Sequence, residues 1–113
     1  MSEIAYPKPT QARADKRRRL ATAAEEAFRG FSKAVFADGA LDRRTKELIA
    51  VAVAHVTQCP WCIQGHTRGA VRAGATPEQV MEAIWVAAEM RAGAAFAHSA
   101  LALDLLEDEG GEG

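Results

Sequence analysis

The chain has 113 residues and a formal net charge of −1 at neutral pH, and 49% of its residues are hydrophobic, many of them alanine. This length fits a single domain, and the near-zero charge argues against bulk electrostatic binding to nucleic acid or to an anionic membrane. Charged residues interrupt every apolar run, so no stretch is expected to span a membrane. No basic region precedes an apolar one at the N-terminus, so a secretory signal is not expected and the cytoplasm is the expected compartment.

The N-terminal third is predicted to be an arm followed by one helix. Residues 1–9 contain two prolines and are expected to be extended. From about Thr10 to Asp38, apolar residues recur at spacings of three and four, which predicts a helix. The basic run at 16–19 lies in its first half. We interpret this run as a solvated turn, because it is short and no aromatic residue interleaves it.

The middle of the chain predicts two helices joined by a short turn. Asp42 is expected to cap a helix that ends near Thr57 and is apolar nearly all round, so it should be the most buried element. Pro60 suits the first position of the next helix, with Cys59 as its capping residue. This helix is expected to end at residues 73–74.

The last third begins with the clearest helix start of the chain, the segment Thr76-Pro77-Glu78-Gln79. Gly93 is expected to break this helix, and a further helix is predicted from Ala94 to about Leu106. The acidic, glycine-rich residues 107–113 are predicted to be a disordered tail. The pattern predicts an all-α protein, with one domain of about five helices over residues 10–106. Because alanine adds little core volume, the subunits are expected to form a homo-oligomer.

The two cysteines of the chain, Cys59 and Cys62, stand three residues apart at a predicted helix start. First-turn N–H groups and the helix dipole favour a thiolate, and two sulfurs at this spacing can close a disulfide with little backbone change. In a reducing compartment such a pair is more often redox-active or metal-binding than a structural staple. The pair therefore predicts a dithiol–disulfide cycle, with two buried structural thiols as the alternative.

His66 lies four residues after Cys62, one helical turn along the same face. It can accept the thiol proton, which predicts a pKa for Cys62 well below the ordinary value of roughly 8.5. The position of Cys59 as the helix cap instead favours a low pKa for Cys59. Glu47 is either an exposed first-turn charge or a carboxylate that orients the histidine, and spacing alone does not choose between the two.

Together these residues resemble a known family signature. Glu47, followed twelve residues later by Cys59-Pro-Trp-Cys62-Ile-Gln-Gly-His66, is similar to the motif of the carboxymuconolactone decarboxylase superfamily, in its alkylhydroperoxidase D-like branch. The flanking segments 46–50 and 73–78 are similar as well, and the resemblance covers about residues 35–105. It implies an all-α fold in trimers or hexamers, with a proton relay through the glutamate, the histidine and the cysteine pair.

The resemblance also implies a role for each site residue. The cysteine that matches Cys62 reacts with the peroxide through a sulfenic acid, and the one that matches Cys59 donates a proton and then closes the disulfide. The implied activity is that of a thiol-dependent peroxidase or disulfide oxidoreductase with Glu47, Cys59, Cys62 and His66 as catalytic residues. Its substrate would be a hydroperoxide or a disulfide and its electron donor an unidentified dithiol, with no cofactor or metal.

Two features set this chain apart within that resemblance. Trp61 stands between the cysteines where the best-studied alkylhydroperoxidase members have a histidine, a departure that bears on the relay and the peroxidase rate. The decarboxylases that name the superfamily lack the cysteine pair, so decarboxylation is not expected here.

Other interpretations stay open from the sequence. His55, Cys59, Cys62 and His66 offer four ligand types that structural zinc accepts, although a histidine at position 55 can also simply close its helix. His98 is expected to be a packing residue of the last helix, with a role in the site as the alternative. Trp61 and Trp85 are read as packing or interface aromatics. A non-catalytic oligomeric interaction protein is the third class of function.

Overall fold

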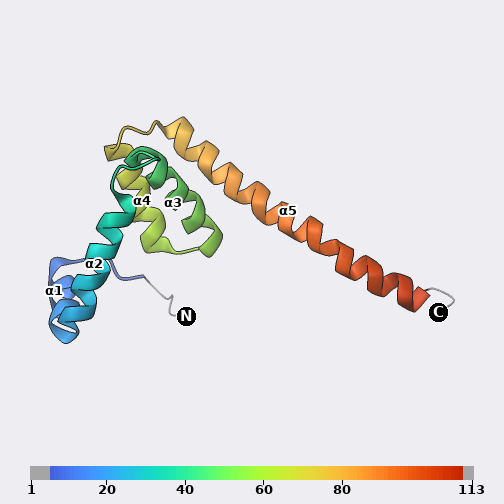
Figure 1. Ribbon diagram of the computed structural model, residues 1–113, viewed down its shortest axis with the longest axis horizontal. Helices are drawn as coiled ribbons and strands as arrows, with labels where there is room; N and C mark the ends of the chain where they lie inside the picture. Colours follow the sequence, from blue (N-terminus) through green and yellow to red (C-terminus); the bar gives the residue numbers. More distant parts are fainter. Residues whose placement is uncertain (1–5, 111–113) are drawn as a thin grey trace, which may run out of the picture.

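The computed structural model describes residues 6–110, so the predictions for 1–5 and 111–113 lie outside the described residues. Between residues 6 and 110 the chain forms five α-helices and no strand, which confirms the all-α prediction. Figure 1 shows them in order. Their bounds are α1 (Gln11–Leu20), α2 (Thr22–Phe36), α3 (Arg43–Thr57), α4 (Pro60–Arg72) and α5 (Pro77–Gly110).

The centre of the molecule is the pair α3 and α4, with the beginning of α5 packed on α3. The core cluster consists of small aliphatic side chains, with Leu48 and Ile84 packed against it: Val51, Ala70, Ala75 and Val80. Helix α3 contributes more buried residues than any other described helix, as predicted from its apolar sequence. Its opposite face is open, since Ile49 and Val53 are about half exposed.

The starts of α3, α4 and α5 confirm the predicted caps. The Asp42 carboxylate accepts a hydrogen bond from the Thr45 N–H at 2.8 Å, and the Cys59 sulfur accepts one from the Cys62 N–H at 3.3 Å. The Thr76 hydroxyl accepts from the Gln79 N–H at 3.1 Å, and the Gln79 side chain accepts from the Thr76 N–H at 3.0 Å. Each cap satisfies N–H groups that a helix start otherwise leaves free.

The single helix predicted between Thr10 and Asp38 is wrong, because the chain breaks at Ala21 into α1 and α2. Ala21 has φ −155° and ψ 65°, outside the helical region. Its N–H and the Thr22 hydroxyl both donate to the Arg18 carbonyl, at 3.3 and 2.8 Å. A threonine hydroxyl that takes a backbone carbonyl competes with helix continuation, and here it allows α1 to fold back against α2.

The predicted break at Gly93 is also wrong, because α5 runs without interruption from Pro77 to Gly110. Glycine lowers helix stability by about 1 kcal/mol but keeps its N–H, so flanking alanines and leucines carry the helix through it. The last four of these residues, 107–110, are helical although the tail was predicted to be disordered from Glu107. The remainder of that tail lies outside the described residues.

The molecule is far more extended than its length requires. Its radius of gyration is 20.0 Å, whereas a compact chain of this size has about 13 Å. Figure 1 shows that most of α5 projects away from the other helices. Along its length α5 exposes large apolar side chains, among them Trp85, Met90, Phe96, Leu101 and Leu105. In the part of the chain that the structure describes, no helix combines the length and the apolarity needed to cross a membrane.

Candidate active site

Glu47 lies in the first turns of α3 and is the one charged side chain that is buried among residues 6–110, at 4% exposure. It is therefore not the exposed first-turn charge that the sequence left open. Two side chains approach it: the Arg43 guanidinium lies 3.6 Å from Oε2, and the His66 imidazole lies 2.7 Å from Oε1. A buried carboxylate without such partners would be costly, so these contacts make its burial possible.

His66 projects from α4 toward α3 and forms the shortest contact of the site with Glu47. An ionised carboxylate only accepts hydrogen bonds, so Nδ1 of His66 donates to Oε1 and Nε2 is left free to accept a proton. The Phe36 ring stacks on the imidazole, with ring centroids 5.0 Å apart and planes 19° apart. The carboxylate and the phenyl ring together fix the tautomer and the orientation of the histidine.

Gly69, one turn after His66 on α4, provides the space that the Glu47 carboxylate occupies. A Cβ at this position would lie 2.7 Å from Oε2, 2.8 Å from Cδ and 2.9 Å from Oε1 of Glu47. Those distances are shorter than van der Waals contact, so any larger residue would push the carboxylate aside. Sequence reasoning missed Gly69, because the clearance depends on how closely α3 and α4 pack.

The cysteine pair is placed by the tight connection between α3 and α4. Gln58 adopts the left-handed conformation, with φ 57° and ψ 47°, and ends α3. Cys59 then has the extended backbone that precedes a proline, and Pro60 begins α4. Both cysteines are free thiols; Cys59 is half-buried and Cys62 is exposed.

The two sulfurs have opposite acid–base properties. The Cys62 thiol and then the Cys62 backbone N–H, both donating to the Cys59 sulfur, lower the pKa of Cys59 below its ordinary value. The same thiol–thiolate hydrogen bond raises the pKa of Cys62, and burial and the Cys59 charge act in the same direction. The prediction of a low pKa for Cys62 is therefore wrong for the reduced pair, and the capping argument for Cys59 is correct.

His66 connects the acid–base pair to the cysteines. A small hollow of about 150 Å³ between α3 and α4 is lined by both Cys62 and His66. A larger cleft of about 580 Å³ is lined by both His66 and Glu47. The imidazole thus contacts Glu47 and borders the same hollow as Cys62.

Trp61, between the cysteines, holds the N-terminal arm. Its indole N–H donates to the Pro7 carbonyl at 2.8 Å, and its ring meets Tyr6 edge-on with centroids 5.0 Å apart. A tryptophan at this position therefore gives the turn between α3 and α4 a contact to a segment more than fifty residues away in the sequence. Nothing in the sequence pattern pointed to this contact.

His55 and His98 each form a hydrogen bond with a carbonyl of their own helix. Nδ1 of His55 hydrogen-bonds the Val51 carbonyl of its own helix at 2.7 Å, and Nδ1 of His98 does the same with Ala94 at 2.8 Å. Neither lines the hollow or the cleft beside His66. Over residues 6–110, no three histidine, cysteine or acidic side chains are grouped as metal ligands would be. The four-ligand zinc interpretation therefore finds no support in the geometry.

The opposite pKa directions predict the reactivity of the single cysteine variants. Cys59→Ser removes the sulfur that raises the pKa of Cys62, so Cys62 should ionise at lower pH and react faster with iodoacetamide at neutral pH. Cys62→Ala removes the thiol donor to Cys59, so the pKa of Cys59 should rise and its alkylation should slow. Alkylation rates measured against pH by mass spectrometry check both directions. Equal shifts of the same sign in the two variants would contradict them.

Both the sequence and the fold are similar to those of known proteins. The sequence profile described as the carboxymuconolactone decarboxylase family matches residues 22–105. A Paracoccus denitrificans protein called uncharacterized protein 4 in the cox locus is 63% identical over 108 residues, which is 96% of either chain.

Solved structures agree with the sequence match. The apo form of a carboxymuconolactone decarboxylase family protein from Legionella pneumophila has a TM-score of 0.68 at 36% identity, covering 86% of this chain and 87% of the other. A family protein from Thermotoga maritima, with a suggested part in an antioxidative response, has a TM-score of 0.58 at 30% identity, covering 76% and 89%.

Proposed function

The chain belongs to the carboxymuconolactone decarboxylase family, and from this premise we propose that it is a thiol-dependent peroxidase of the alkylhydroperoxidase D-like type. The observation that carries the proposal is the buried Glu47–His66 hydrogen bond of 2.7 Å, beside a hollow that His66 shares with Cys62. A buried carboxylate that orients a histidine, next to a reactive thiol, is the arrangement of an activated nucleophile. The antioxidative role suggested for the Thermotoga maritima relative supports the same class of reaction.

In the proposed first step, Cys62 attacks the hydroperoxide. Cys62 is the exposed sulfur, so a peroxide can reach it, but its raised pKa means that it needs a base. His66 takes the thiol proton at Nε2, and Glu47 stabilises the imidazolium that forms. The thiolate takes the terminal oxygen as the O–O bond breaks, the proton goes to the leaving alkoxide, and the products are a Cys62 sulfenic acid and an alcohol.

In the proposed second step, Cys59 resolves the sulfenic acid. Its pKa is lowered by the hydrogen bonds from Cys62, which raises the thiolate fraction that a resolving thiol needs. The S–S bond forms, the sulfenic hydroxyl leaves with a proton as water, and the two-electron oxidation of the dithiol is complete. A dithiol donor then restores both thiols. With a disulfide substrate, the Cys62 thiolate would instead attack one substrate sulfur and release the other as a thiol. Cys59 would then displace the second thiol from the mixed disulfide and leave the Cys59–Cys62 disulfide.

The proposed activity is tested by combining the reduced protein with an organic hydroperoxide and a dithiol donor. Two free thiols before and none after one equivalent of peroxide, with alcohol formed in equal amount, are the expected results. Metal analysis of protein purified without chelators runs in parallel. Stoichiometric zinc held by the cysteines, or thiols that survive excess peroxide, would contradict the proposal.

We also propose that the working unit is a homo-oligomer, a trimer or a hexamer. The evidence is the extended shape, with a radius of gyration of 20.0 Å, and the many large apolar side chains that α5 exposes. Burial of apolar area contributes roughly 25 cal/mol per Å², which strongly favours covering such a surface. Sedimentation equilibrium at micromolar concentration should give three or six chains per particle. A monomer in that experiment would refute this prediction.

A further inference from the structure

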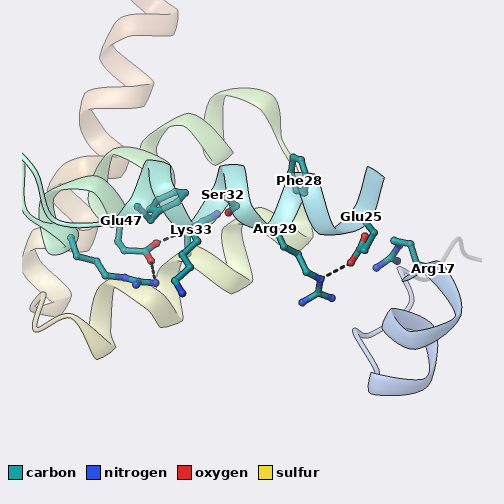
Figure 2. Close-up of a pocket in the computed structure, with 10 residues that line it drawn as sticks. Arg17, Glu25, Phe28, Arg29, Ser32, Lys33 and Glu47 are labelled. Carbon is teal, nitrogen blue, oxygen red and sulfur yellow. Dashed lines mark hydrogen bonds and ion pairs between the residues drawn. The ribbon is translucent and has the colours of Figure 1, made fainter. Parts of the chain in front are cut away.

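The larger cleft beside His66 is lined by charged and aromatic residues that the proposed peroxidase cycle does not use. It occupies about 580 Å³ along α2, from Phe36, which stacks on His66, to Arg17 of α1. Figure 2 shows Glu47 at one end of the cleft and Arg17 at the other, with Phe28 and Lys33 projecting from opposite sides of α2 between them. The cleft therefore leads from open solvent to the acid–base pair.

The charges in this cleft do not balance. Its lining includes four cations but only two carboxylates, those of Glu25 and Glu47. Both carboxylates already have partners, since Glu25 pairs with Arg29 at 2.7 Å and Glu47 with Arg43 and His66. Within residues 6–110 no ion pair or side-chain hydrogen bond involves Arg17 or Lys33. Two cations are thus left to attract an anion into the cleft.

Two aromatic side chains also line this cleft. Phe28 is 65% exposed, and Phe36 covers His66. Lys33 and Phe36 are three residues apart in α2 and so lie on the same face, one turn from each other. A ligand held at Lys33 would therefore lie about one helical turn from the imidazole.

From the unpaired cations that lie beside aromatic side chains and His66, we propose that the cleft binds an organic hydroperoxide as substrate. This substrate has an apolar body and a carboxylate, and the carboxylate is the end that the cations bind. The inference rests on the proposed peroxidase function and names its substrate class. The carboxylate pairs with Lys33, the apolar body lies against Phe36, and the hydroperoxide points to His66, which also lines the hollow that Cys62 borders. Arg17, at the far end of the cleft, adds to the attraction for the anion. Cys62 and Cys59 together lose two electrons, and the peroxide yields an alcohol and water. Organic hydroperoxides charged at neutral pH commonly carry that charge on a carboxylate, which is why we commit to this group.

The test compares cumene hydroperoxide with its para-carboxylate, two substrates that differ only in the charged group. The wild-type protein should oxidise its dithiol with a kcat/KM about tenfold higher for the carboxylate, mostly through KM, as a charge-assisted contact provides. Lys33→Met should remove most of that preference, so that the kcat/KM ratio of the two substrates falls toward one. Added salt should lower the preference in the wild type.

Lys16→Met is the matched control, because it removes the same charge from an exposed lysine of α1 that does not line the cleft. Binding of unreactive 4-isopropylbenzoate, followed by calorimetry, separates the cleft from the chemistry. Equal rates with the two peroxides, or equal effects of Lys16→Met and Lys33→Met, would overturn the cleft inference while the peroxidase function stands. If neither peroxide is reduced, the proposed function fails. In that case the cleft is still supported as an organic-anion site if 4-isopropylbenzoate binds the wild type but not Lys33→Met. The absence of both turnover and binding would overturn both proposals.

Discussion

Cys62→Ser is expected to abolish peroxide-driven turnover, whereas Cys59→Ser is expected to permit one oxidation event and then stop. Cys62 is the exposed sulfur and shares a hollow with His66, so its loss removes the sulfur that we propose as the nucleophile. Without Cys59 the sulfenic acid on Cys62 has no neighbouring thiolate to close the disulfide, and it should accumulate. The expected loss of steady-state activity is complete in both variants.

Dimedone trapping followed by mass spectrometry distinguishes the roles of the two sulfurs. The wild type should give transient label on Cys62, Cys59→Ser should give stable label on Cys62, and Cys62→Ser should give none. This experiment is needed because the pKa directions by themselves would favour attack by Cys59, whose thiolate is the more stable one. Label on Cys59 in the wild type, or turnover by Cys62→Ser, would reverse the assignment and leave the dithiol cycle intact.

Gly69→Ala is expected to reduce the rate of Cys62 oxidation at neutral pH on the order of tenfold to a hundredfold, although it adds only one methyl group. The new Cβ would lie within 2.9 Å of three atoms of the Glu47 carboxylate, which must then move away from His66. General-base catalysis typically raises a reaction rate by a factor of about 10²–10⁴. A base that loses its orienting carboxylate should lose a large part of that factor. Gly69 is thus a positioning residue that acts through Glu47.

Gly65→Ala is the matched control, since it makes the same change one turn earlier on α4, where a Cβ would have nothing within 4 Å. Alanine in place of glycine should stabilise the helix at this position by about 0.5–1 kcal/mol with no loss of activity. A thermal melt beside the kinetic assay separates the two effects. Equal activity of Gly65→Ala and Gly69→Ala would exclude the proposed clearance role.

Two further variants connect the Gly69 effect to the relay. Glu47→Gln and His66→Ala should also slow alkylation of Cys62 at neutral pH, with the glutamate change the weaker. All three defects should shrink at high pH, where the thiol ionises unaided. Because Gly69→Ala acts through the carboxylate, combining it with Glu47→Gln should add little to the single variants. Additive effects would show that Gly69 acts on the site by another route.

The sequence by itself determined those features that depend on neighbours within one or two helical turns. The helix starts at Asp42, Pro60 and Thr76 were correct, because a cap is a hydrogen bond between residues three apart. The cysteine spacing and the position of His66 one turn beyond Cys62 are likewise local, and the family motif could be recognised from them. Local pattern failed at Ala21 and Gly93. At Ala21 the Thr22 hydroxyl bonds the Arg18 carbonyl, a contact that weakens helix continuation, and at position 93 ordinary helix formers outweighed the glycine.

Only the tertiary structure decided which residues meet across helices. Glu47 and His66 are nineteen residues apart, and the packing of α3 on α4 brings them to 2.7 Å and buries the carboxylate. That packing is close because position 69 has no side chain, a fact that no helical periodicity records. Such outcomes depend on distances of a few tenths of an ångström between elements, and sequence spacing constrains only the distances within one element.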